Sequence, residues 1–378
     1  MTLCINYVEQ IYFNVSGDLH LERVQYGIPA RYQDNQKCIE AIVKNTCADP
    51  DCRGIILTGD SFHKKALLPR FQLLFRDMHA RIKNGGKNLW AIDGNHDGSD
   101  ASWLDTIDPA INANGRILSI GSKKGAFFAF QERTQLYGNV KKAAPQIQVL
   151  VLHGRLLELL TWARAQKEPD YDFSAQELRD LGLRHCTVLM GDIHTYSDFY
   201  DPVGDNWFIY AGSTEMTEVG EGNVLSERFG NKYDTVKKYI RFFPDRPHGE
   251  NWEVVDLPNR PFMKRIITLA EDVDLAIQHL DRWVCEHPKG ILALRYPFEL
   301  RGVLQPHLAR WKAALLALFD APVSANISKP LQDMREIDIL SIAEKELNPG
   351  QIQILKVVLA NEQFDKELKQ ALAAGGVT

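Results

Sequence analysis

The sequence predicts a layered α/β domain followed by a smaller α+β unit, and two observations support this. Up to residue 262, short apolar runs rich in β-branched and aromatic residues alternate with stretches of helical periodicity, a pattern typical of sheets covered by helices. The chain has 378 residues, of which 45% are hydrophobic and 25% charged, an ordinary composition for a globular protein with a sizeable core.

Six apolar runs are predicted to be strands because each is short enough for a strand that is buried on both faces. They are residues 11–16, 53–60, 87–94, 147–154, 186–192 and 206–213. Two stretches, 33–47 and 67–83, place apolar residues at intervals of three and four and are predicted to be helices. Strands and helices therefore alternate along this part of the chain.

A stretch rich in Pro, Asn and Asp, residues 241–262, indicates the end of the first domain. Beyond it, a strand, a helix, a strand and a helix are predicted at 264–270, 271–287, 290–300 and 306–319. The expected domains are 1–262, a small α+β unit at 263–330 and a helical C-terminal region at 331–378. The apolar positions of that region either pack internally or form a docking surface for a coiled-coil partner.

Five of the predicted strands end in side chains of the types that bind metal ions. In chain order these are Asp18, His20, Asp60, His63, Asn95, His96, Asp97, His153, Asp192 and His194. Ligands bind outside the carboxyl ends of the strands in open α/β sheets, so we expect these side chains to converge. Singly, each has a plainer explanation, such as a helix cap for an Asp after a strand. Those explanations do not account for five such strand ends together.

The spacing of these residues also has chemical content. In D-x-H, at Asp18–His20 and Asp192–His194, the two side chains project to the same side of an extended segment. A mixed set of Asp, His and Asn suits divalent ions such as manganese, iron or zinc rather than calcium. The set exceeds the needs of one ion and fits two ions about 3.5–4 Å apart, the arrangement used in phosphate ester hydrolysis.

The motifs D-x-H, G-D-x-x, G-N-H-D, a single His and G-x-x-H, in this order, resemble the calcineurin-like metallophosphoesterase superfamily. The resemblance implies a β-sandwich flanked by helices over about residues 13–265, with a small capping domain beyond. Three stretches, GDSFH (59–63), YAGSTEMTEVGE (210–221) and LPNRPF (257–262), are similar to the SbcD-type DNA repair nucleases of this superfamily.

The resemblance implies a role for each residue of the site. The first metal would be held by Asp18, His20 and His194, the second by Asn95, His153 and Asp192, and Asp60 would bridge them. His96 would be the catalytic histidine, oriented by Asp97, and His63 would lie beside the substrate phosphate. The nucleophile would be a bound water with a lowered pKa. The ions would be two divalent cations, Mn²⁺ first, with Mg²⁺, Fe²⁺ or Zn²⁺ as alternatives.

Asp192 departs from the superfamily pattern, which usually has His at this position in G-H-x-H. A carboxylate here favours harder ions such as manganese or magnesium. Two interpretations stay open: Asp192 binds the second metal directly, or it binds through water and the second site is weak.

The resemblance implies a DNA exonuclease or endonuclease, the subunit of an SbcCD-like repair or recombination complex. It would act as a homodimer with an SbcC-type coiled-coil ATPase, and the capping domain would contribute DNA binding or specificity. One alternative is a metallophosphoesterase for small phosphodiesters, nucleotides or phosphoproteins, which the net charge of −5 favours slightly. Another is a DNA-end-binding scaffold whose second metal site is impaired by Asp192.

The basic residues outside the motifs are expected to be solvated, with contact to a DNA backbone as the alternative. They are Arg70, Arg76, Arg81, Lys83 and Lys87, and, after the last motif, Lys232, Lys237, Lys238 and Arg241. The N-terminus has no basic n-region, and no apolar run approaches the roughly 20 residues of a membrane span. We therefore expect a cytoplasmic protein, at the nucleoid in a bacterium or in the host cytoplasm if phage-encoded.

Overall fold

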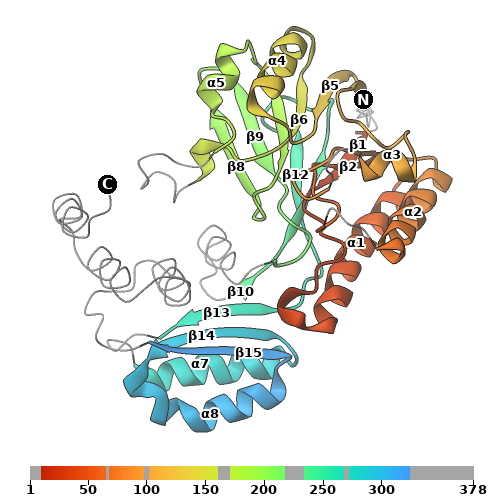
Figure 1. Cartoon of the computed structure of the whole chain (residues 1–378). Helices are drawn as coiled ribbons and strands as arrows, with labels where there is room; N and C mark the ends of the chain where they lie inside the picture. Colours follow the sequence, from red (N-terminus) through yellow and green to blue (C-terminus); the bar gives the residue numbers. More distant parts are fainter. Residues whose placement is uncertain are drawn as a thin grey trace, which may run out of the picture. The chain divides into compact units, whose positions relative to one another are not determined.

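The computed structural model describes residues 10–64, 68–97, 102–160, 171–217, 234–267 and 272–323. The chain divides into two compact units, Met1–Lys264 and Arg265–Thr378 (Figure 1). Within the described ranges, no helix is both long and apolar enough to cross a membrane.

The first unit contains two mixed β-sheets. One has the order β12 (Trp252–Asp256), β11 (Lys238–Phe242), β1 (Tyr12–Ser16), β2 (Cys52–Leu57), β3 (Asn88–Ala91). The other has the order β4 (Ile117–Ile120), β5 (Lys123–Phe128), β6 (Val149–His153), β7 (Thr187–Gly191), β9 (Asn206–Tyr210), β8 (Ser197–Asp201). Strands β1, β2 and β3 are parallel to one another, as are β5, β6, β7 and β9. The six predicted strands correspond to β1, β2, β3, β6, β7 and β9.

The two sheets pack face to face. Alternate residues of each strand point to opposite faces, so one set of side chains from each sheet faces the other sheet. Phe13, Val15 and Ile56 of the first sheet share a buried core with Val151 and Leu189 of the second. On the outer faces, α1 (Pro29–Ala48) and α2 (Pro69–Asn84) cover the first sheet, and α4 (Arg133–Ala143) and α5 (Ala175–Asp180) cover the second (Figure 1). The predicted layered sandwich flanked by helices is confirmed.

Shorter helical segments complete the first unit. They are α3 (Trp103–Ile107), η1 (Gln25–Gly27), η2 (Ala144–Gln146) and η3 (Leu157–Leu159). Helix α1 begins at Pro29, earlier than the predicted residue 33. Its first turns bury the polar residues Arg31 and Asp34, so the periodicity of apolar residues does not mark this part of the helix. Proline is favoured in the first turn of a helix, where its missing N–H is not needed.

The described residues of the second unit form two helices against a small sheet. The elements are α7 (Val273–Glu286), β14 (Ile291–Pro297), η5 (Phe298–Leu300), α8 (Arg301–Ala314) and β15 (Ala317–Val323). β10 (Asp234–Thr235), in the first unit, pairs antiparallel with β13 (Phe262–Ile266), which spans the boundary between the units. Residues 331–378, predicted as a helical region that docks an ATPase, lie outside the described residues, as does Lys232.

The prediction of one helix at 306–319 is wrong at both ends. Helix α8 begins earlier, at Arg301, and the chain from Ala317 onward forms β15. This strand runs parallel to β14, with Ile291 opposite Ala317. A short apolar run has no periodicity that separates a buried strand from a helix, so the strand partner decides its conformation.

Candidate metal centre

The carboxyl ends of parallel strands from both sheets meet at one edge of the sandwich. Gly17, after β1, forms a parallel bridge with Ser213, after β9. The N–H of Asp18 donates to the carbonyl of Gly59 at 3.0 Å. The residues predicted for the site lie just beyond these strand ends, and the contacts described below bring them together.

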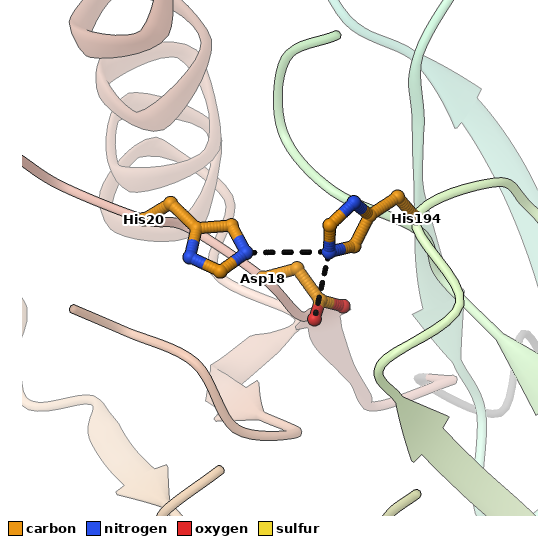
Figure 2. Close-up of side chains that lie close together, drawn as sticks. All are labelled: Asp18, His20 and His194. Carbon is orange, nitrogen blue, oxygen red and sulfur yellow. Dashed lines mark hydrogen bonds and ion pairs between the residues drawn. The ribbon is translucent and has the colours of Figure 1, made fainter. Parts of the chain in front are cut away.

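The first ligand group consists of Asp18, His20 and His194 (Figure 2). The Nε2 atoms of His20 and His194 lie 3.2 Å apart, and His194 Nε2 lies 3.7 Å from Asp18 Oδ1. His194 Nδ1 lies 2.6 Å from Thr217 Oγ1, which leaves Nε2 directed at the group. Hydrogen bonding of the second ring nitrogen is how proteins orient metal-binding histidines. Thr217 was not predicted from the sequence.

The second ligand group consists of Asp18, Asp60 and His153. His153 Nε2 lies 3.7 Å from Asp60 Oδ1, and His153 Nδ1 lies 2.8 Å from the carbonyl oxygen of Thr58. The other oxygen of Asp60 lies 3.9 Å from His20 Nε2. Asp60 therefore reaches ligands of both groups, the position required of a bridging carboxylate.

The donor set fits divalent cations. The side-chain amide of Asn95 lies 3.0 and 3.2 Å from the two carboxylate oxygens of Asp60. Asp18 and Asp60 are each only 1% exposed. Burial raises the pKa of Asp18 to about 6, although His194 and His153 oppose this shift. Buried carboxylates are costly unless a positive charge compensates them, and cations bound between these oxygens would do so.

Without a metal, a proton on His153 offsets part of the negative charge of these buried carboxylates. Burial alone would lower the pKa of His153, but the carboxylates of Asp60, Asp18 and Asp192 outweigh it and raise the pKa to about 9. His153 is therefore protonated at pH 7 and must lose its Nε2 proton to bind a metal. We expect Mn²⁺ binding at pH 7 to release about one proton per chain. Calorimetry in buffers of different ionisation enthalpy measures this release, and a binding enthalpy that does not depend on the buffer would contradict it.

Two further histidines, His63 and His96, lie beside the first ligand group. Their rings are stacked with centroids 5.4 Å apart, and His96 Nδ1 lies 3.1 Å from the carbonyl oxygen of His63. His63 Nδ1 lies 3.4 Å from His20 Nδ1. Burial, with Arg23 next, lowers the pKa of His63 to about 4, so this ring is neutral at pH 7. The N–H of His96 donates to Asp60 Oδ1 at 3.0 Å, which fixes the loop against the bridging carboxylate.

Asp97 does not have the partner predicted for it. Its carboxylate accepts hydrogen bonds from the backbone N–H groups of Ser61 (3.2 Å), Phe62 (2.7 Å) and Gly94 (2.8 Å) rather than from the His96 ring. Asp97 is 1% exposed, and in this position it satisfies amides of two loops. Burial, with the charge of Asp60, raises its pKa to about 8 against these bonds. Asp97 thus orients the Asp60 and Asn95 loops and reaches His96 only through the backbone.

The backbone at the site adopts conformations that are uncommon for residues with a side chain. The φ angles of Asp18, His20, Asp60 and Asp192 are +50°, +43°, +50° and +91°. Such strain is stored mainly at functional sites. Gly94 is required for a steric reason instead: a Cβ at this position would lie 2.1 Å from Asp60 Oδ1. The sequence reveals the glycines but not which atoms approach them.

Asp192 lies between His153, a predicted ligand, and the guanidinium group of Arg155, which was not predicted as part of the site. Its Oδ1 is 3.9 Å from His153 Nε2, and its Oδ2 is 3.5 Å from Nε of Arg155. Its N–H donates to Asp18 Oδ1 at 3.1 Å. Burial raises the pKa of Asp192, while His153 and Arg155 lower it. The sequence places Arg155 two residues after His153, but nothing local links it to Asp192.

The interpretation of Lys237 as a solvated or DNA-contacting residue is wrong. Lys237 is 1% exposed, and its Nζ donates to the carbonyl oxygen of His194 at 2.5 Å and to Ser213 Oγ at 2.7 Å. It therefore holds the backbone of a predicted metal ligand.

The adjacent Lys238 pairs instead with the exposed Asp256. Arg81, on α2, forms a two-point ion pair with Glu40.

A model of the calcineurin-like phosphoesterase family matches residues 11–206, just over half of the chain. Two curated relatives are called DNA double-strand break repair protein Mre11. The one from Methanosarcina mazei is 24% identical over 221 residues, which cover 54% of this chain and 34% of the relative. The one from Haloferax volcanii is 27% identical over 278 residues, which cover 69% of this chain and 54% of the relative. The chain thus spans between about a third and about half of these relatives.

Among solved structures, the zinc complex of wild-type Vps29 from Entamoeba histolytica matches with a TM-score of 0.32 and 13% identity. The match covers 65% of this chain and 99% of that chain.

Proposed function

Since the chain belongs to the calcineurin-like phosphoesterase family, we propose that it is a two-metal phosphodiesterase that hydrolyses DNA, the exonuclease or endonuclease subunit of an SbcCD-like complex. The observation that carries the proposal is the pair of ligand groups that share Asp18 and are linked by Asp60, all buried except the half-buried His194. Both relatives named above are DNA double-strand break repair proteins, which supports DNA as the substrate.

The residues would divide between two cations, with Mn²⁺ as the proposed metal. Asp18, His20 and His194 would hold the first, Asn95, His153 and Asp192 the second, and Asp60 both. Bound cations of this kind neutralise phosphate charge and lower the pKa of an attacking water. The contacts of His153 Nδ1 with the carbonyl oxygen of Thr58 and of His194 Nδ1 with Thr217 Oγ1 hold these rings in place before the substrate arrives, and Gly94 leaves room for Asp60.

His96 would protonate the leaving oxygen of the scissile phosphodiester. Its Nδ1 is held by the carbonyl oxygen of His63, so that Nε2 is the atom available to the substrate. It would donate a proton from Nε2 to the departing 3′- or 5′-oxygen. His63 is neutral at pH 7 because of its lowered pKa. It would therefore contact the phosphate through a hydrogen bond rather than a full charge.

The experiment that tests the proposal is cleavage of single- and double-stranded DNA by the purified chain with Mn²⁺, alone and with an SbcC-type ATPase. We expect metal-dependent cleavage that is lost in His96→Ala. Absence of cleavage with the partner present, or cleavage unchanged in His96→Ala, would overturn the assignment. A panel of small phosphodiesters, nucleotides and phosphopeptides tests the alternative, which a net charge of −5 favours.

An exposed aromatic residue beside the site favours a polynucleotide over a small ester. Phe130, two residues after β5, is 43% exposed, and its ring centroid lies 6.3 Å from that of His153. Its N–H donates to the carbonyl oxygen of Asp93 at 2.9 Å, which ties it to the loop that carries Asn95 and His96. A nucleobase next to the scissile phosphate could stack on this ring, as bases do in proteins that bind single strands.

We therefore expect Phe130→Ala to raise KM for an oligonucleotide about 10-fold, since one stacked base contributes about 1–3 kcal/mol. Phe130→Trp should restore the parent value because it retains an aromatic face. The control substrate is the same oligonucleotide with an abasic residue at the cleavage position, on which all three proteins should be alike. An equal loss on both substrates would show that Phe130 supports the fold instead.

The assembly and location of the protein follow as part of the same proposal. It would form a homodimer and act with an SbcC-type coiled-coil ATPase. The unit beyond residue 264 would serve as the cap that contributes DNA binding or specificity. It would work in the cytoplasm, at the nucleoid in a bacterium or in the host cytoplasm if phage-encoded. Co-purification of the chain with the ATPase, and its mass in solution, test these points.

A further inference from the structure

The carboxylate of Asp192 has its two oxygens committed to different partners. Oδ1 lies 3.9 Å from His153 Nε2, toward the second ligand group, and Oδ2 lies 3.5 Å from Nε of Arg155. The side chain of Asp192 is 19% exposed, so it also has access to water. Which way this carboxylate points therefore depends on what holds Oδ2.

Arg155 is itself fixed by a second carboxylate. Its Nε lies 3.3 Å from Asp172 Oδ2, and its N–H donates to the same oxygen at 2.7 Å. The backbone on either side is also tied: the N–H groups of Asp172 and Phe173 donate to the carbonyl oxygen of Arg155 at 3.0 and 3.3 Å. Arg155 is thus held from both backbone and side chain, and it presents its Nε at a set position between two acids.

The charges around Asp192 explain why the position of Arg155 matters. Asp192 brings a further carboxylate to the buried carboxylate of Asp18, and its backbone N–H donates to Asp18 Oδ1 and Oδ2 at 3.1 and 3.3 Å. Like charges in a buried site repel one another, and a carboxylate with a route to water turns outward unless a positive group retains it. Arg155 is the positively charged side chain paired with Oδ2 of Asp192, on the side away from His153.

We propose that Arg155 is a positioning residue for the second metal, which it serves by holding Oδ2 of Asp192 so that Oδ1 faces His153 and the bound cation. This inference rests on the proposed two-metal site. It explains why Arg155 accompanies the carboxylate at position 192. A neutral histidine at this position, as is usual in the superfamily, would need no positively charged partner. It also predicts that Arg155 matters only while residue 192 is acidic.

The test is a double-mutant cycle read by Mn²⁺ titration calorimetry without DNA. In the parent background, Arg155→Ala should weaken the second equivalent about 10- to 100-fold, as loss of an outer partner of a metal ligand does, and leave the first equivalent unchanged. In the Asp192→His background, the same substitution should change neither equivalent by more than about 2-fold, since the pair no longer exists. Arg155→Lys keeps the charge and should retain part of the affinity.

Arg179→Ala is the matched control, because Arg179 also pairs with a carboxylate, Asp201, which is not a predicted metal ligand. It should leave both binding constants as they are. The inference is overturned if Arg155→Ala leaves the second equivalent unchanged, weakens both equally, or costs as much in the Asp192→His background. Unchanged Mn²⁺ binding with a raised KM for DNA would make Arg155 a substrate contact instead. A parent chain that binds a single equivalent overturns the two-metal site and this inference with it.

Discussion

Replacing His96 with alanine is expected to lower kcat for DNA cleavage by about 10²- to 10⁴-fold, the range for loss of a general acid. The change removes the ring that would protonate the leaving oxygen. It keeps the backbone N–H that donates to Asp60 Oδ1 at 3.0 Å, so the bridging carboxylate stays in place. Mn²⁺ binding and KM should therefore change little. Steady-state kinetics and a Mn²⁺ titration on the same preparation separate these effects.

The control for this variant is His79→Ala, which removes a histidine of α2 that lies 3.8 Å from Asp108 and outside the ligand groups. It should cleave DNA like the parent. A His96→Ala protein that keeps full kcat, or that loses Mn²⁺ together with activity, would show that His96 is not the acid.

Replacing Lys237 with methionine is expected to weaken Mn²⁺ binding about 10- to 100-fold, as loss of the outer partners of metal ligands commonly does. Methionine fills similar space but cannot donate to the carbonyl oxygen of His194 or to Ser213 Oγ. The backbone of His194 then loses a fixed support, and the weakened metal should be the one held by Asp18, His20 and His194. Calorimetry of Mn²⁺ binding, with thermal unfolding of the metal-free protein beside it, measures the loss.

The neighbouring lysine supplies the matched control. Lys238 pairs with the exposed Asp256, and pairs of this kind on a surface contribute little to stability. Lys238→Met should therefore bind Mn²⁺ and unfold like the parent. Equal behaviour of the two methionine variants would show that the buried lysine does not support the site.

The positions of the candidate metal ligands could be predicted because each motif is local and its context is simple. Asp18 and His20 directly follow a buried strand, as do Asp192 and His194, and parallel strands bring their carboxyl ends to one edge. The pattern of ligand types therefore carries spatial information. The partners of those residues could not be predicted in the same way, because they come from remote parts of the chain.

Lys237 and Asp97 show why. Lys237 directly precedes β11 and is as buried as Tyr239 within it, but a lysine is rarely buried without a specific partner. Only the structure reveals that partner as the carbonyl of His194. Asp97 follows His96 directly, which suggests that the two side chains interact, yet its carboxylate bonds amides of a loop more than thirty residues earlier.

The strands that could not be predicted are mostly edge or antiparallel strands. β12, for example, lies at the edge of its sheet and has mostly exposed or half-buried residues, so it lacks the continuous apolar run that identifies β6 or β7. β15 begins with a short apolar run but contains Asp320, and its residues are half-buried or exposed, so its start also fits a helix. Pairing with β14 decides the outcome, and this pairing is a property of the tertiary structure.

The two-metal centre is tested most directly by the number of Mn²⁺ ions bound per chain. We expect two equivalents, with an electron paramagnetic resonance signal from spin-coupled ions, and loss of that coupling in Asp60→Ala. This outcome would also exclude a scaffold with an impaired second site. A single bound equivalent in the parent chain, or two uncoupled ions that do not depend on Asp60, would contradict it.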